Sequence, residues 1–198
     1  MSKKIYIVLT DTGTLLSKAI GLYTKRDLNH ASIAFDEGLR EMYSFGRKQR
    51  HNPFIGGFVK EEATEGIFED ANCAIFSCEV TNEEYVRMRN KIRQFERDQE
   101  LYRYNFIGLF GVALNKDIQR DRAFFCSQFV ATIVNEAGLA MFSVNPNLVQ
   151  PHDFAKVACL LQEYDGDLQA YLHKKRGQQE RRLVRVSMWK SLAFRLLA

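Results

Sequence analysis

Two stretches that suit extended structure, Ala31-Ser-Ile-Ala-Phe35 and Arg40-Glu-Met-Tyr-Ser-Phe45, flank the segment Asp36-Glu-Gly-Leu39. Extended runs on either side of a glycine-containing turn are typical of a β-hairpin. Because neighbouring strands of a hairpin are antiparallel, this stretch predicts an antiparallel sheet in the N-terminal quarter of the chain.

Other strands and helices are expected on both sides of this hairpin. Strands are expected at 5–9, 73–80 and 157–163, and helices at 14–22, 81–99, 104–114, 124–137 and, briefly, from 153 onward. Thr81 and Glu84 form a capping-box signature, and Gly138 is a natural helix stop. Residues 46–57 are expected to form a loop. The interleaved pattern predicts an α+β domain with an antiparallel sheet packed against helices.

The charge is divided unevenly along the chain. The 198 residues carry a net charge of +4, but residues 174–198 hold eight basic residues and one acidic residue. We therefore divide the chain into a domain over 1–173 and a basic amphipathic C-terminal helix over 174–198. Such asymmetry indicates an acidic partner for the tail, either a membrane surface or a partner protein. No nucleic-acid-binding motif is present, and the remainder of the chain is mildly acidic.

The first apolar run and the spacing of the cysteines bear on the cellular compartment and on metal binding. The apolar run Ile5–Leu9 is shorter than the 7–15 residues of a signal-peptide core, which favours a cytoplasmic protein, peripheral to a membrane if the tail binds one. The four cysteines form no CxxC motif, and Cys73 and Cys78 have a spacing that suits a strand better than a zinc site. Free thiols are therefore expected, with no metal or cofactor.

Cys126 is the first candidate for chemistry. It begins the regular part, 126–137, of the helix expected at 124–137 rather than lying inside it, and unpaired backbone N–H groups and the helix dipole converge there. That environment favours a nucleophilic thiolate, and Ser127 with the helix amides could stabilise an oxyanion. The alternative interpretation is a small buried core thiol.

A nucleophilic cysteine needs a base, for which His30 at the start of the first hairpin strand is the best placed of four histidines. A satisfied or exposed strand-end histidine is the alternative. With Glu37-Gly38 as the turn, Tyr43 would lie diagonal to His30 on the same face, and Glu41 further along it. A slip of one residue would bring Ser44 to that face instead.

These segments together resemble a known family. The resemblance rests on Asn29–Phe35, Tyr43–Gly46, Tyr102–Phe106, Phe124–Val130 and Pro151–Phe154. They are similar to five segments of the circularly permuted NlpC-type papain-like hydrolases, in the same order along the chain. These segments are the strand that carries the histidine, the third polar residue, an aromatic segment, the motif of the nucleophilic cysteine and a Pro–x–Asp segment. His30 precedes Cys126 by 96 residues, which is the permuted order.

The resemblance implies a papain-like fold and a thiol hydrolase or acyltransferase of the cysteine peptidase or amidase type. Cys126 would attack an amide, ester or thioester carbonyl after His30 removes its proton, forming an acyl-enzyme. Tyr43 is the third member by position and Glu41 by chemistry, while Ser127 and Tyr104 would contact the substrate. Relatives act on peptides, lipids or other acyl compounds. The alternative is a non-catalytic lipid- or peptide-binding module that keeps the same pocket.

Overall fold

The computed structural model describes residues 2–11, 28–47, 56–105, 108 and 120–196. Its main feature is a six-stranded sheet with the order β4-β3-β2-β1-β5-β8, in which every neighbouring pair is antiparallel. The strands are β1 (Lys3–Asp11), β2 (His30–Ala34), β3 (Met42–Arg47), β4 (Gly56–Glu61), β5 (Asn72–Val80) and β8 (Leu161–Asp167). A short parallel pair, β6 (Arg103–Tyr104) and β7 (Ala123–Phe124), lies outside this sheet.

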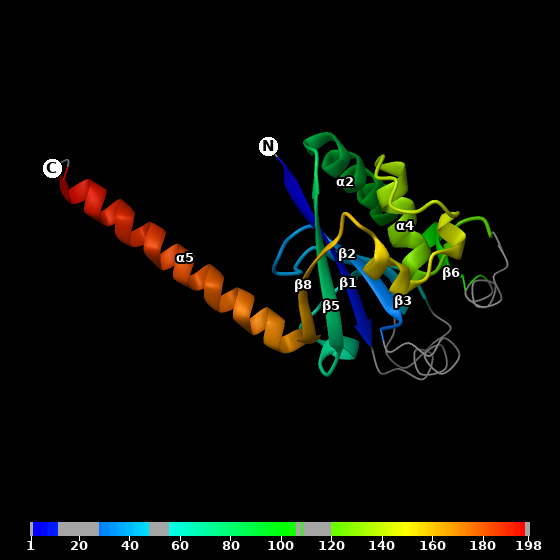
Figure 1. The fold of residues 1–198 in the computed structure, drawn as a ribbon, viewed down its shortest axis with the longest axis horizontal. Helices are drawn as coiled ribbons and strands as arrows, with labels where there is room; N and C mark the ends of the chain where they lie inside the picture. The colour runs from blue at the N-terminus through cyan, green and yellow to red at the C-terminus, as the bar shows by residue number, and fades with distance from the viewer. Residues whose placement is uncertain (1, 12–27, 48–55, 106–107, 109–119, 197–198) are drawn as a thin grey trace.

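The α-helices labelled in Figure 1 are α2 (Asn82–Arg97), α4 (Cys126–Glu136) and α5 (Leu168–Leu196). Short 3-10 helices occupy Gly66–Phe68, Gln99–Leu101, Pro146–Leu148 and Pro151–Lys156. The predicted capping box is confirmed, because Thr81 Oγ1 accepts from the Glu84 N–H and the Glu84 carboxylate accepts from the Thr81 N–H. Gly138 follows α4 with φ of +99°, a conformation that favours glycine and explains the stop.

The two faces of the sheet bury separate apolar clusters. One face packs against α2 and α4, and its core includes Ile7, Ile33 and Phe129. The opposite face packs against the first turns of α5, with Val8 and Tyr171 among its buried residues. The α+β class and the antiparallel sheet covered by helices are therefore confirmed.

A group of aromatic rings joins α4 to the hairpin. The Phe45 ring of β3 lies 5.2 Å from that of Phe129 in α4 and 5.1 Å from that of Phe124 in β7. Phe58 of β4 and Phe95 of α2 complete the group, with ring centroids 5.7 Å apart. Since such contacts are directional as well as apolar, they fix where the first turn of α4 lies relative to β2, β3 and β4.

Two strands differ from the sequence prediction. The segment expected as a loop from Gly46 to Gly57 ends in β4, which pairs with β3 along its whole length. The strand expected at 157–163 begins only at Leu161, because the Val157 and Leu160 N–H groups close turns onto Phe154 and Val157. The helix expected at 14–22 and most of that at 104–114 lie outside the described residues.

The C-terminal helix begins earlier than the basic tail. α5 starts at Leu168, so its first turns belong to the domain over 1–173, and the helix then extends away from the sheet (Figure 1). Among the described helices, none has a segment of the length and hydropathy required to cross a bilayer.

Candidate active site

The structure joins His30 to a carboxylate that the sequence analysis did not select. His30 is the first residue of β2, and its Nε2 lies 2.8 Å from Oε1 of Glu61, the last residue of β4. Both side chains are mostly buried, with 12% of His30 and 5% of Glu61 exposed. Because water is largely excluded, this contact is a strong charge-assisted interaction.

Two serines complete the environment of the Glu61 carboxylate. Ser44 Oγ donates to Oε1 over 2.6 Å, and Ser32 Oγ donates to Oε2 over 2.5 Å. A buried carboxylate is stable only where its lone pairs are satisfied, and here both oxygens accept hydrogen bonds. The serines therefore hold the carboxylate in place for His30.

The hairpin register places neither Tyr43 nor Glu41, the predicted third members, beside His30. Tyr43 pairs with Ile33 and Met42 with Ala34, one residue away from the predicted register. Since side chains alternate, Tyr43 joins the apolar cluster beneath α2 and α4, while Ser44 shares the face of His30. The slip of one residue, weighed as the alternative, is the one that the structure adopts.

The turn itself causes this shift. The Asp36 carboxylate accepts from the N–H groups of Gly38 and Glu41, and Leu39 adopts φ of +55°. This makes the connection wider than the two-residue turn assumed at Glu37-Gly38. Glu41 instead pairs with Arg89 of α2, over 2.8 and 3.0 Å, and so turns away from His30.

The neighbours of His30 strongly favour its charged form. Burial lowers the pKa of the ring, but the Glu61 carboxylate and hydrogen bonds to Cys126 and Glu61 outweigh it and raise the pKa to about 10. His30 is therefore an imidazolium at neutral pH. Because Nε2 is held by Glu61, Nδ1 is the ring nitrogen left for Cys126.

Cys126 is the first residue of α4, as predicted, and only 3% of it is exposed. The chain enters the helix through an extended Phe125, whose N–H donates to the Gln128 side chain over 3.3 Å. The N–H groups of Cys126, Ser127 and Gln128 come before the first N–H that has an intrahelical acceptor, that of Phe129, and point out of the helix start. The thiol therefore lies at the positive end of the helix, and Cys126 is among the groups that raise the pKa of the His30 ring.

The side chains that follow Cys126 hold a neighbouring loop. Ser127 Oγ donates to the Val149 carbonyl over 2.7 Å, and Gln128 Nε2 donates to Asn147 Oδ1 over 2.6 Å. The Ser127 hydroxyl is therefore buried and donates within the protein, and the predicted contact of Ser127 with substrate is not tested. Its backbone N–H remains as the group that could meet an oxyanion.

The predicted contact of Tyr104 with substrate is not tested. Tyr104 lies half-buried on β6, and its side chain packs so closely against Gly56 of β4 that a Cβ there would lie 2.9 Å from the Tyr104 Cβ. The next residue, Asn105, is fully buried, and its Oδ1 accepts from the Gly108 N–H over 2.8 Å. The Tyr104–Asn105 segment therefore packs against β4, the strand that ends in Glu61.

The remaining histidines and cysteines of the described ranges do not join this site. His173 is exposed on α5, and the Nε2 atom of His152 lies 3.5 Å from Oδ1 of Asp153. All four cysteines are free thiols, and burial raises the pKa of Cys73 to about 12. Within the described ranges, no three His, Cys, Asp or Glu side chains are grouped in a way that could hold a metal ion.

Glu61 was missed because β4 carries a weak strand signal. Gly56 and Gly57 resemble turn residues, and only Phe58 and Val59 are apolar before the charged Lys60-Glu61.

Comparison of the chain with protein-family models, with curated proteins and with solved structures gave no match.

Proposed function

We propose that this chain is a thiol hydrolase or acyltransferase that uses Cys126, His30 and Glu61 on an amide, ester or thioester bond. The observation that carries the proposal is the buried His30–Glu61 contact of 2.8 Å, together with the place of Cys126 at the start of α4, where it helps to raise the pKa of the same ring. A nucleophilic thiol, a base and an orienting carboxylate are the three parts that such catalysis requires.

Acylation follows from this arrangement. The Cys126 thiolate, paired with the His30 imidazolium, attacks the carbonyl carbon of the substrate. The resulting oxyanion lies near the free N–H groups at the start of α4, which stabilise negative charge. As the bond to the leaving group breaks, His30 gives its proton to the departing nitrogen, oxygen or sulfur, leaving an acyl thioester on Cys126.

Deacylation uses the same groups in reverse order. His30, now neutral, takes a proton from water or from an acceptor amine as that nucleophile attacks the thioester. Cys126 departs as a thiolate, and the imidazolium is restored beside Glu61. Glu61 acts through His30 as a positioning residue, because it fixes the ring by Nε2 and stabilises its charge.

The resemblance to permuted NlpC-type papain-like hydrolases supports the same assignment. In this interpretation the antiparallel sheet and α4 form the papain-like core, with Glu61 in the role first assigned to Tyr43 or Glu41. A reducing compartment such as the cytoplasm suits the chemistry, since the nucleophile must remain a thiol. The tail that begins at Lys174 remains a candidate for binding a membrane surface or a partner protein.

The proposal is tested by turnover of a panel of p-nitroanilides, p-nitrophenyl esters and acyl thioesters by the full chain. Hydrolysis of at least one class should fall by more than a hundredfold in Cys126→Ala and His30→Ala. Cys159→Ala is the matched control, because it removes an exposed thiol elsewhere, and it should retain full activity. Activity that survives Cys126→Ala would refute the assignment.

The alternative is a non-catalytic lipid- or peptide-binding module. Binding of a pocket ligand alone does not require a fully satisfied carboxylate behind His30, so the network of Ser32, Ser44 and Glu61 favours the enzyme. Saturable ligand binding without turnover by any substrate class would favour the module.

A further inference from the structure

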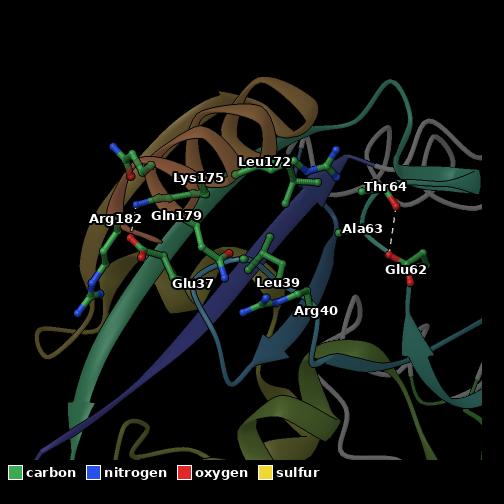
Figure 2. A pocket seen from close by; sticks show the side chains of 13 residues that line it. Glu37, Leu39, Arg40, Glu62, Ala63, Thr64, Leu172, Lys175, Gln179 and Arg182 are labelled. Atoms are coloured by element: carbon green, nitrogen blue, oxygen red, sulfur yellow. Dashed lines mark hydrogen bonds and ion pairs between the residues drawn. The ribbon is translucent and has the colours of Figure 1, made fainter. Parts of the chain in front are cut away.

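A concave site lies at the base of α5, and its lining includes none of the residues of the proposed active site. The cavity has a volume of about 860 Å³ and lies between α5, the β2–β3 turn and the segment that follows β4 (Figure 2). This volume is within the range of pockets that hold small molecules.

The cavity exists because α5 is held to the sheet only at its start. The Leu168 N–H donates to the Ala71 carbonyl, Gln169 Nε2 donates to the Ala63 and Phe68 carbonyls, and Tyr171 Oη donates to the Glu37 carbonyl. From Lys175 onward the helix leaves the sheet, and the diverging surfaces enclose the cavity (Figures 1 and 2). The base of α5 therefore has a fixed position against the sheet, and the helix beyond it forms one side of the cavity.

The floor of the cavity is apolar and its rim is basic. Leu39, Ala63 and Leu172 are buried residues of the lining. The charged members of the lining are four basic and two acidic residues, a net charge of +2: Arg40, Lys175, Arg176, Arg182, Glu37 and Glu62. A ligand with an anionic group and an apolar part would match both surfaces.

Two of the basic residues are not committed to acidic neighbours. Lys175 pairs with Glu37, and Arg40 Nε lies 3.1 Å from Asp36 Oδ1. Arg176 and Arg182 form no ion pair with any residue of the described ranges. Both belong to the lining of the cavity, six residues or about 9 Å apart along the helix, and their guanidinium groups are free for a ligand.

We propose that this cavity binds a phosphate-bearing ligand, with Arg176 and Arg182 as the principal contacts and the Leu39–Leu172 floor beneath the apolar part of the ligand. Guanidinium groups match the geometry of phosphate oxygens and form paired hydrogen bonds to them. The same chemistry is presented by a soluble phosphate ester and by the headgroup of an anionic lipid. The site is independent of the proposed reaction at Cys126.

The test uses the full chain and two probes. Glycerol 3-phosphate is titrated by calorimetry, and flotation is measured with phosphatidylcholine vesicles that contain or lack 30 mol % phosphatidic acid. Binding of glycerol 3-phosphate would identify a soluble ester as sufficient. Binding to the phosphatidic acid vesicles alone would identify a lipid headgroup.

Matched double variants separate a site from general attraction to a basic helix. Arg176→Gln with Arg182→Gln removes two charges from the cavity, and Lys174→Gln with Arg181→Gln removes two exposed charges of α5 that do not line it. The first pair should weaken binding at least tenfold and the second less than threefold. The thermal unfolding midpoint of each variant verifies that both remain folded.

Two results would overturn the proposal. Equal weakening in both double variants would show only non-specific attraction, and absence of binding by wild-type protein to both probes would show that no such site exists. Activity at Cys126 is measured separately, so failure of the cavity proposal and failure of the proposed hydrolase are distinguishable.

Discussion

Replacement of Glu61 by Gln removes the charge that keeps His30 protonated while keeping the shape of the side chain. Burial alone lowers the pKa of His30, and the carboxylate is the main group that raises it to about 10. In Glu61→Gln the pKa of the ring should therefore fall towards or below its ordinary value of 6.5.

The magnitude follows from proton linkage. The raised pKa of His30 stabilises the folded state fully below 6.5, and this stabilisation is lost as the pH rises through about 10. Between these values the folded protein holds one proton more than the unfolded chain, so the unfolding free energy falls by about 1.4 kcal/mol per pH unit. From pH 7 to pH 9 the contribution of His30 is a loss of about 3 kcal/mol.

Two measurements test this reasoning. Urea unfolding at pH 7, 8 and 9 should show a steeper loss of stability in wild-type protein than in Glu61→Gln, by about 3 kcal/mol over the range. The His30 ring resonances should titrate near 10 in wild-type protein and near or below 6.5 in the variant. Glu62→Gln, which changes the next and exposed carboxylate, is the matched control and should behave as wild type. A His30 titration that is unchanged by Glu61→Gln would refute the reasoning.

Three further predictions concern the register, the core and a helix end. Tyr43→Phe and Glu41→Gln should each change the alkylation rate of Cys126 by less than twofold, because neither side chain orients His30; a tenfold change would restore them as candidates. Phe129→Ala should lower the unfolding free energy by about 3–5 kcal/mol, since its ring is fully buried between β3, β4 and α2; urea unfolding measures the loss, and a loss below about 1 kcal/mol would contradict this packing. Gly138→Ala should cost about 1 kcal/mol or more, because φ is +99° there, and an unchanged thermal midpoint would contradict this geometry.

The sequence was most informative where a pattern is local. The hairpin of the runs at 31–35 and 40–45, the capping box at Thr81 and the helix from Cys126 each depend on near neighbours, and the structure confirms all three, although Phe124 lies in β7 rather than in the helix. The placement of Cys126 at a helix start follows from the same local pattern.

The orienting carboxylate depends on long-range pairing, which local patterns do not specify. Glu61 reaches His30 only because β4 joins the edge of the hairpin and because the wider turn shifts β3 by one residue. A difference of one residue in register exchanges Tyr43 for Ser44 at the site, and no short-range signal in the hairpin distinguishes the two. Similarly, the cavity beneath α5 depends on contacts between Gln169 or Tyr171 and segments about a hundred residues earlier in the chain.

The most direct test of the proposed function is detection of the acyl-enzyme. Wild-type protein is mixed with a p-nitrophenyl ester, quenched with acid, and analysed by intact and peptide mass spectrometry. We expect one acyl group on Cys126, formed in wild-type protein and Cys159→Ala and absent in His30→Ala. Acylation of Cys126 no faster than that of Cys73 or Cys159, or acylation that persists in His30→Ala, would contradict the proposed catalytic site.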